Sequence, residues 1–308
     1  MSDLHVIVGA GPVGRATAVH LAGEGREVVL ASRSGSGAEI AGVRRVAADA
    51  ADADGLTALA AGAVALYNCV NPPSYHVWPT YWPPIAAALA TAAERTGAVL
   101  VVTGNLYPYG PVDGAMTEDL PDAATGVKGA LRARMWADLA RRHEQGSLRA
   151  VEVRGADYMG PGVTNAHIPV AAGRALAGKT ARVFGDPDAP HSMTDVRDMA
   201  TAMVTVATEP TAWGRVWHAP TNPARNQAET LADVCAAAGR PAVAVRAWPR
   251  VMLSVGGTVV PFLREMRETA YQFESPYVLD SSAIGDAFGL TPTPWDEVCR
   301  ATASTVTG

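Results

Sequence analysis

The stretch LHVIVGAGPVG, residues 4–14, sets the expectation for the fold. Its first five residues form an apolar run of the kind that builds a buried strand. A glycine-rich hexapeptide follows, and an alanine-rich segment with helical spacing continues through Ala22. Strand, tight turn and helix in this order predict the first unit of a βαβ fold.

The hexapeptide GAGPVG fits the pattern GxGxxG. In such a turn the first glycine permits the tight bend, the second lets the backbone approach a pyrophosphate, and the third lets the helix pack closely on the strand. The helix start adds free N–H groups and a positive dipole end, which favour phosphates. Glycine-rich turns are common, so the inference depends on the strand–turn–helix context. We predict a dinucleotide site made by Gly9, Gly11, Pro12, Val13 and Gly14.

The end of the second strand, predicted at 27–31, distinguishes NAD from NADP. An NAD site places Asp or Glu there to hold the ribose 2′-hydroxyl, but here the chain continues with Ser32 and Arg33. Arg33 can bind a 2′-phosphate and Ser32 can add a hydrogen bond, which favours NADP(H); the alternative is an ordinary exposed arginine. Asp49, after the strand predicted at 43–47, is a candidate for the adenine amino group or a solvated turn residue.

Strands and helices alternate through the first half of the chain. This alternation is typical of the α/β class and predicts a Rossmann-like, doubly wound parallel sheet. The further strands are expected at 63–70, 98–103 and 148–154, and the helices at 55–61, 85–96 and 125–144.

After Arg154 the elements become shorter and are interrupted by proline and glycine. Helices are expected at 195–208 and 229–238, and a strand at 213–219. We predict a dinucleotide-binding Rossmann domain at 1–160 and a smaller substrate-binding part at 161–308, some segments of which return to the first domain.

Composition excludes several classes of protein. The 308 residues include 25 Lys+Arg and 30 Asp+Glu, a net charge of −5, which argues against nucleic-acid and membrane partners. A signal peptide and a long apolar run are both missing, so we expect a cytoplasmic protein. The three cysteines lie far apart and the histidines form no HxH or HExxH, so neither a disulfide framework nor a metal site is expected.

With these elements assembled, nearly the whole chain resembles the extended short-chain dehydrogenase/reductase superfamily, the NAD(P)-dependent epimerase/dehydratase group. Each mark of the resemblance is weak alone, but their order and spacing are specific. The marks are GAGPVG, ADAAD at 48–52, Tyr109-Gly110, TED at 117–119, Arg154 with GPG at 160–162, GD at 185–186 with VRD at 196–198, and FGLTPTPW at 288–295. The resemblance implies an NAD(P)-dependent enzyme, and dimers are common in the family, so a homodimer is one possible state.

The resemblance also locates an active site that departs from the family pattern. The family has a YxxxK motif, in which Lys holds the nicotinamide ribose and lowers the pKa of Tyr, and a Ser or Thr four residues before the Tyr-Gly pair. Lys128 fits the lysine position, but Ala124 stands where Tyr belongs and Asn105 where Ser or Thr belongs. Alanine cannot transfer a proton, so the usual mechanism is not available unmodified.

Tyr107 is the substitute that the resemblance suggests, because some family dehydratases carry a catalytic Glu at this position, facing the substrate. Near the positive charge of Lys128, we expect the pKa of Tyr107 to fall enough for general acid or base work. The alternative is that Tyr107 only packs against its loop.

Four further residues are candidates for the substrate pocket. Family members that act on nucleotide sugars usually carry an Arg where His191 stands, and His is a poorer diphosphate clamp. We therefore expect a smaller, less anionic substrate and not a nucleotide sugar. Tyr158 and His167 flank the GPG turn, although a lone histidine is more often structural. Trp82 belongs to the aromatic segment 75–82, which either forms the wall of an apolar pocket or is a proline-braced loop packed for stability.

The leading hypothesis is an NADP(H)-dependent oxidoreductase or epimerase-like enzyme that acts on a small carbonyl or hydroxyl substrate. One alternative is a regulatory protein that binds a dinucleotide without hydride transfer. The other is a non-redox isomerase, cyclase or lyase that reuses the pocket. Lys128 favours catalysis slightly, because a sensor could dispense with it.

Overall fold

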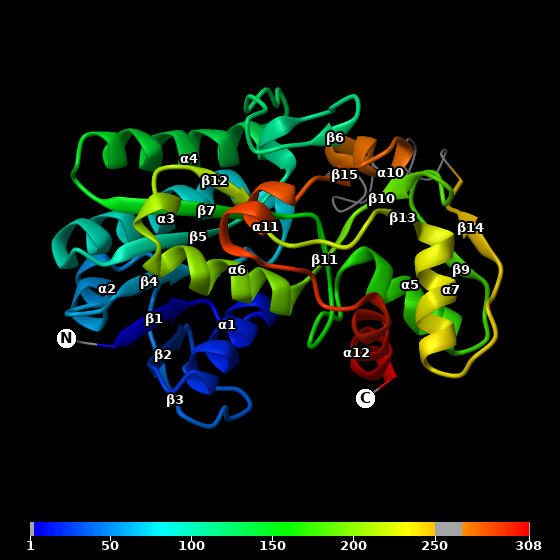
Figure 1. Cartoon of the computed structure of the whole chain (residues 1–308), viewed down its shortest axis with the longest axis horizontal. Coiled ribbons are helices and arrows are strands. Elements are labelled where there is room, and N and C mark those ends of the chain that lie inside the picture. Colours follow the sequence, from blue (N-terminus) through cyan, green and yellow to red (C-terminus); the bar gives the residue numbers. More distant parts are fainter. Residues whose placement is uncertain (1–2, 250–266, 308) are drawn as a thin grey trace.

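A seven-stranded, fully parallel sheet lies at the centre of the computed structural model, which describes residues 3–249 and 267–307 (Figure 1). The strand order is β12-β7-β5-β4-β1-β2-β3, as predicted for a Rossmann-like sheet. The strands are β1 Leu4–Val8, β2 Glu27–Ser32, β3 Val43–Ala47, β4 Ala65–Asn68, β5 Val99–Asn105, β7 Arg149–Gly155 and β12 Val216–His218.

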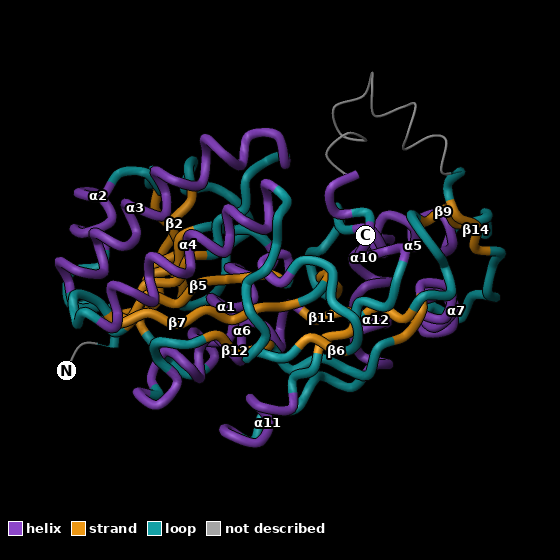
Figure 2. The backbone as a smooth tube through the Cα atoms, turned by 90° about the horizontal axis from the view of Figure 1, so that it is seen from above, coloured by secondary structure: helices purple, strands orange, loops and turns teal. Residues whose placement is uncertain are grey.

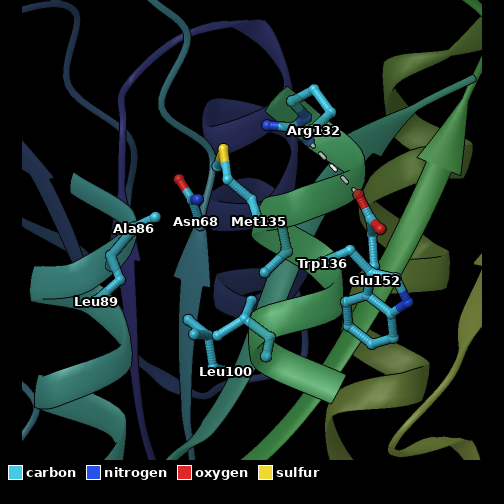
Figure 3. Close-up of a pocket in the computed structure, with 10 residues that line it drawn as sticks. Asn68, Ala86, Leu89, Leu100, Arg132, Met135, Trp136 and Glu152 are labelled. Carbon is cyan, nitrogen blue, oxygen red and sulfur yellow. Dashed lines mark ion pairs between the residues drawn. The ribbon is translucent and has the colours of Figure 1, made fainter. Parts of the chain in front are cut away.

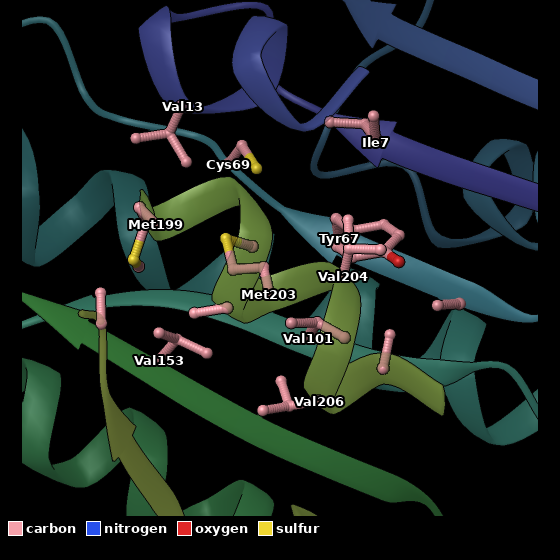
Figure 4. Packing of buried hydrophobic residues seen from close by; sticks show 14 of the residues in the cluster. Ile7, Val13, Tyr67, Cys69, Val101, Val153, Met199, Met203, Val204 and Val206 are labelled. Carbon is pink, nitrogen blue, oxygen red and sulfur yellow. The ribbon is translucent and has the colours of Figure 1, made fainter. Parts of the chain in front are cut away.

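Helices cover both faces of the sheet because its strands are apolar on both faces. On one face, Ile7, Val101 and Val153 pack with α1 and α6; Figure 4 shows the methionines of α6 over Val101 and Val153. On the other face, Val6 and Leu100 pack with the remaining three helices. The helices are α1 Pro12–Gly23 and α6 Val196–Thr208, then α2 Ala53–Leu59, α3 Trp78–Thr96 and α4 Val127–Glu144.

A second, smaller core lies at one end of the molecule. Three helices pack around it, and Figures 1 and 2 both show them away from the main sheet. They are α5 His167–Leu176, α7 Gln227–Ala237 and α12 Trp295–Thr307, flanked by the strand pair β9 Ala181–Val183 and β14 Val245–Ala247.

Short elements connect the two cores. The strand pairs are β8 Asp157–Met159 with β11 Met193–Asp195, β6 Ala115–Met116 with β15 Val278–Leu279, and β10 Pro190–His191 with β13 Arg225–Asn226. The remaining elements are η1 Tyr75–Val77, η2 Tyr107–Tyr109, η3 Pro210–Ala212, α10 Tyr271–Glu274 and α11 Ser282–Phe288.

Two elements beyond residue 160 return to the main sheet. The strand expected at 213–219 is β12, which pairs in parallel with β7, and α6 packs beside α1. The α/β class and the doubly wound sheet are confirmed, whereas the boundary at residue 160 stays a prediction. Within the described ranges, no helix has the length and apolarity needed to cross a membrane.

Candidate active site at the carboxyl edge of the sheet

The turn between β1 and α1 needs glycine at two of its three glycine positions. Gly9 has φ +109°, and a Cβ there would lie 2.4 Å from the carbonyl oxygen of Cys69. A Cβ on Gly14 would lie 1.9 Å from the carbonyl oxygen of Gly9. Gly11 differs, because a Cβ there would meet nothing within 4 Å. Backbone atoms therefore enclose the turn at Gly9 and Gly14, whereas the space in front of Gly11 is open.

The open side of this turn fits a pyrophosphate. Gly11 is the N-cap of α1 and has no side chain to cap the helix, and Pro12 follows at the first helical position. The first N–H groups of the helix therefore have no side-chain partner at the cap. Such a helix end attracts phosphate oxygens. The assignment of Gly9, Gly11, Pro12, Val13 and Gly14 to a dinucleotide site stays a prediction.

The end of β2 carries no carboxylate. Ser32 is half-buried, and its hydroxyl accepts a hydrogen bond from the N–H of Gly35 at 3.2 Å. Arg33 is exposed, and no described residue forms an ion pair with it. Arg45 holds the following loop by donating to the carbonyl oxygens of Gly35, at 3.3 Å, and Ala38, at 2.9 Å. The loop is thus fixed by Arg45, and the guanidinium of Arg33 is left facing solvent.

Asp49 lies after β3, at the same edge of the sheet. Its Oδ1 accepts a hydrogen bond from the N–H of Ala51 at 2.9 Å, which forms a local turn before α2. The side chain is exposed. Both interpretations of Asp49, adenine contact and turn residue, remain compatible with this position.

Asn105 and Tyr107 lie at the end of β5 and in η2. The side-chain oxygen of Asn105 accepts the N–H of Tyr107 at 3.2 Å, so its amide group keeps its own donors for a ligand. The hydroxyl of Tyr107 lies 2.8 Å from the hydroxyl of Tyr75, which η1 supplies from the connection after β4. Tyr107 is 8% exposed, whereas Tyr75 is half-buried.

Lys128 completes this group from the first turn of α4. Its Nζ lies 5.2 Å from the ring centroid of Tyr75 and 2.8 Å from Oε2 of Glu268. Glu268 also accepts the backbone N–H of Lys128 at 2.6 Å, so one carboxylate holds both the helix start and the ammonium. The Lys128 side chain is 2% exposed.

Residue 124 has no catalytic capacity and is packed tightly. The N–H of Ala124 donates to the carbonyl oxygen of Pro108 at 2.9 Å. A Cβ on Gly129 would lie 2.4 Å from the Cβ of Ala124 and 2.4 Å from the carbonyl oxygen of Tyr107. The start of α4 therefore packs directly on η2, which brings Lys128 and Tyr107 to one place.

The expected lowering of the pKa of Tyr107 is wrong. Burial raises the pKa of Tyr107 well above its ordinary value. Burial likewise raises the pKa of Tyr75 to about 12. The charge of Lys128 is already balanced by Glu268, so desolvation of the phenols prevails. Tyr107 is thus protonated at neutral pH and is a weaker acid than a solvent-exposed tyrosine.

The four candidates for the substrate pocket lie in different parts of the structure. His167 and His191 both contact the ring of Phe273, with ring centroids 4.6 Å and 5.3 Å away. His191 is 2% exposed, and its Nε2 lies 3.2 Å from Oδ2 of Asp157. Although burial alone raises the pKa of Asp157, the contact with His191 lowers it below its ordinary value.

Tyr158 and Trp82 lie outside the group of rings around Phe273. The hydroxyl of Tyr158 donates to the carbonyl oxygen of Gly104 at 3.2 Å, just before Asn105. Trp82 is 2% exposed in the core under α3, where the guanidinium carbon of Arg132 lies 4.9 Å from its ring centroid. The structure does not bring Trp82 together with the other pocket candidates.

Three residues near the site were not singled out from the sequence. Tyr75 was part of the aromatic segment 75–82, but nothing in the local pattern paired it with Tyr107. Glu268 and Asp157 carried no motif, because their partners Lys128 and His191 are distant in the chain. Among the described residues, no cluster of His, Cys, Asp or Glu could hold a metal ion.

A small cavity under α3 and α4 is not the substrate site. It measures about 10 Å³, room for about one water molecule. Figure 3 shows its mostly apolar lining and the ion pair of Arg132 and Glu152 at one side. It lies between the helices and the sheet, and no residue of the turn from Gly9 to Gly14 lines it.

Comparison with known proteins identifies relatives of this arrangement. A model of the NAD dependent epimerase/dehydratase family matches residues 5–218. A comparison with curated sequences finds no match. The structure is similar to UDP-glucose 4-epimerase of Thermus thermophilus in complex with NAD, at 19% identity and TM-score 0.78, with 99% of each chain covered.

Two further solved structures are similar. dTDP-glucose 4,6-dehydratase of Bacillus anthracis, in complex with NAD, has 14% identity and TM-score 0.79, with 99% of this chain and 97% of that chain covered. UDP-glucose 4-epimerase of Thermotoga maritima, with UDP-glucose, has 13% identity and TM-score 0.79, with 99% of this chain and 98% of that chain covered. At these identities the similarity shows a shared fold.

These neighbours correct one prediction. The expectation that the substrate is not a nucleotide sugar is contradicted, because the similar Thermotoga maritima enzyme binds UDP-glucose. The expectation depended on His191 being a poorer diphosphate clamp than the arginine usual at this position. In the structure His191 is buried between Phe273 and Asp157, and its Nδ1 lies 3.0 Å from the carbonyl oxygen of Gln272. Its identity therefore does not report on the charge of the substrate.

Proposed function

Because the chain belongs to the NAD dependent epimerase/dehydratase family, we propose that it is an NADP(H)-dependent enzyme that moves hydride to or from a substrate carbon carrying a hydroxyl or carbonyl group. The observation that supports this most directly is the joint placement of the open turn before α1 and the group Asn105, Tyr107 and Lys128. Both lie at the carboxyl edge of one parallel sheet, where ligands of this fold bind.

The preference for NADP(H) is proposed from the end of β2. No acidic residue follows the strand, and the exposed guanidinium of Arg33 is available for a 2′-phosphate. Ser32 is next to it and has a hydroxyl that can also donate. Charge-assisted hydrogen bonds of this type contribute roughly 1.5–3 kcal/mol each.

The site residues then have separate roles. The bound nicotinamide would supply or accept the hydride. Lys128 would hold the nicotinamide ribose while Glu268 keeps its ammonium in place. The amide of Asn105 would donate a hydrogen bond to the substrate oxygen, and Tyr107 would donate a proton to it or take one from it. UDP-glucose and dTDP-glucose are the first substrates to test, since similar proteins are named for them.

Calorimetric titration with NADPH and NADH tests the cofactor. We expect NADPH to bind more tightly, and Arg33→Ala to weaken NADPH about 10- to 150-fold while leaving NADH unchanged. Arg44→Ala is a matched control, because Arg44 is also exposed but lies near the start of β3. Equal affinities for the two nucleotides, or a preference that survives Arg33→Ala, would remove Arg33 from the proposal.

Tyr107→Phe tests the chemistry. This change keeps the ring and removes the phenol, so turnover should fall about 100- to 10,000-fold while NADPH affinity is unchanged. A variant with full turnover would exclude Tyr107 as the proton donor.

A second function is favoured by the pairing of Lys128 with Glu268 and by the loss of the tyrosine at position 124. Both are compatible with a protein that binds the dinucleotide without hydride transfer. Tight NADPH binding together with no redox change in any nucleotide sugar or carbonyl compound would replace the first function with this one.

A further inference from the structure

Tyr75 occupies a position that links Lys128 to Tyr107. Its ring packs edge-on against Trp78, with centroids 5.1 Å apart, and lies under the ammonium of Lys128. Its hydroxyl is 2.8 Å from that of Tyr107. We propose that Tyr75 is a positioning and proton-relay residue that connects Lys128 and solvent to the proton donor Tyr107. This proposal rests on the function proposed above.

Position 124, where the family pattern has the tyrosine that acts with the lysine, is alanine in this chain. The ammonium of Lys128 lies over the ring of Tyr75, 5.2 Å from its centroid. An ammonium over an aromatic face is attracted to it, and the attraction grows when the ring carries negative charge. Burial and the carboxylate of Asp157 raise the pKa of both phenols, but the hydrogen bond between them lowers the pKa of Tyr75 and raises that of Tyr107, so Tyr75 is the phenol that more readily bears a transient negative charge.

The two tyrosines differ in solvent exposure, and this difference sets the direction in which the proton moves. Tyr107 is 8% exposed, while Tyr75 is half-buried and closer to solvent. A buried acid that has released its proton needs a route for its return, and the hydroxyl pair at 2.8 Å provides one.

The steps balance in the reducing direction. The substrate carbonyl carbon would gain a hydride from NADPH, which would leave as NADP+, and the carbonyl oxygen would gain the proton of Tyr107, which gives the alcohol. The phenolate of Tyr107 then takes the proton of Tyr75 through their hydrogen bond. Tyr75 regains a proton from water, so the net change is one hydride and one proton added to the carbonyl group. Oxidation follows the same steps in reverse.

Tyr75→Phe separates this role from packing, because it keeps the ring, the contact with Lys128 and the contact with Trp78. We expect kcat to fall at least about 10-fold, less than the loss in Tyr107→Phe, with KM and NADPH affinity unchanged. Added imidazole buffer should restore part of the turnover and should alter the pH profile of kcat. Tyr81→Phe is the matched control, since Tyr81 is a half-buried tyrosine of the adjoining α3 turn, and it should match the wild type.

A second measurement needs no nucleotide or substrate. Fluorine NMR of a fluorotyrosine installed at position 107 should show a resonance that moves in Tyr75→Phe and stays in Tyr81→Phe, since only the first removes the hydroxyl at 2.8 Å. An unmoved resonance would show that the hydroxyl pair is not formed, and would overturn the relay.

The outcomes separate the two proposals. Full turnover in Tyr75→Phe, beside an active wild type, overturns the relay and leaves the proposed function standing. A loss without buffer rescue and with a raised KM assigns Tyr75 a structural role, which also overturns the relay. If the wild type transfers no hydride to any substrate while NADPH still binds, the proposed function fails and the relay fails with it.

Discussion

Glu152 lies between two buried arginines, and its replacement by glutamine should destabilise the protein strongly. Its Oε2 is 3.1 Å from Nη2 of Arg154 and its Oε1 is 3.6 Å from Nη2 of Arg132. All three side chains are at most 4% exposed. Arg154 keeps Asp122 as a second partner, at 2.7 Å. Arg132 would keep the carbonyl oxygen of Thr103, at 2.6 Å, and the ring of Trp82, but no described carboxylate.

Removing one partner of a buried ion pair costs about 3–5 kcal/mol, because the other charge stays buried without compensation. Glu152→Gln keeps the shape of the side chain and removes only its charge. We therefore expect the variant to lose this full range of unfolding free energy. Asp122→Asn is the matched control: Asp122 is 24% exposed and Arg154 retains Glu152, so its loss should be about 1 kcal/mol or less. Chemical denaturation followed by circular dichroism measures both.

A third variant identifies the cause. Adding Arg132→Met to Glu152→Gln removes the stranded cation and should recover a large part of the lost free energy of unfolding. The reasoning is refuted if Glu152→Gln costs less than about 1 kcal/mol, or if Asp122→Asn costs as much. The network joins α4 to β5 and β7, the elements that carry Lys128 and Asn105, so its loss should also weaken NADPH binding.

Four further predictions concern single residues. Gly11→Ala should leave the free energy of unfolding unchanged, since a Cβ there meets nothing within 4 Å, but should weaken NADPH binding in a titration because the methyl group enters the open turn. Gly14→Ala should lower the melting temperature, because its Cβ would lie 1.9 Å from a backbone oxygen; a normal melting curve would contradict this. Lys128→Met should lower both NADPH affinity and turnover, and a loss of turnover alone would argue against its contact with the ribose. Burial raises the pKa of Asp198 from 3.8 to about 6, so the folded protein keeps a proton that the unfolded chain loses between pH about 4 and 6. The free energy of unfolding should therefore rise as the pH falls through this window, by on the order of 3 kcal/mol, and Asp198→Asn should flatten the slope.

The parallel sheet could be predicted because its strands are continuous apolar runs separated by helical spacing. The strand expected at 43–47 matches β3. The helix expected at 125–144 matches α4, which begins at Val127. The start of α3 could not be predicted, because Pro79, Pro83 and Pro84 argue against a helix. The helix begins at Trp78 nevertheless, since Trp78 and Trp82 become buried in the core, and this packing outweighs local preference.

The candidate site was predictable only where a motif is local. The turn at Gly9 to Gly14 is contiguous, and Lys128 could be located by its spacing in the family pattern. Only the fold brings Tyr75 and Glu268 to the site. Tyr75 meets Tyr107 because β4 and β5 are neighbouring strands, and Glu268 reaches Lys128 from near the end of the chain. The pKa of Tyr107 depended on burial and on the pairing of Lys128 with Glu268, neither of which a sequence pattern records.

The pairing of β12 with β7 has a consequence for synthesis of the protein. As the nascent chain leaves the ribosome, the outer edge of β7 has no partner until residues 216–218 emerge, and α6 reaches its face of the sheet only shortly before. An unpaired strand edge and an uncovered apolar face promote association between chains. A fragment that stops at residue 160 would carry both defects permanently. A recombinant fragment built on the main sheet should therefore extend through His218.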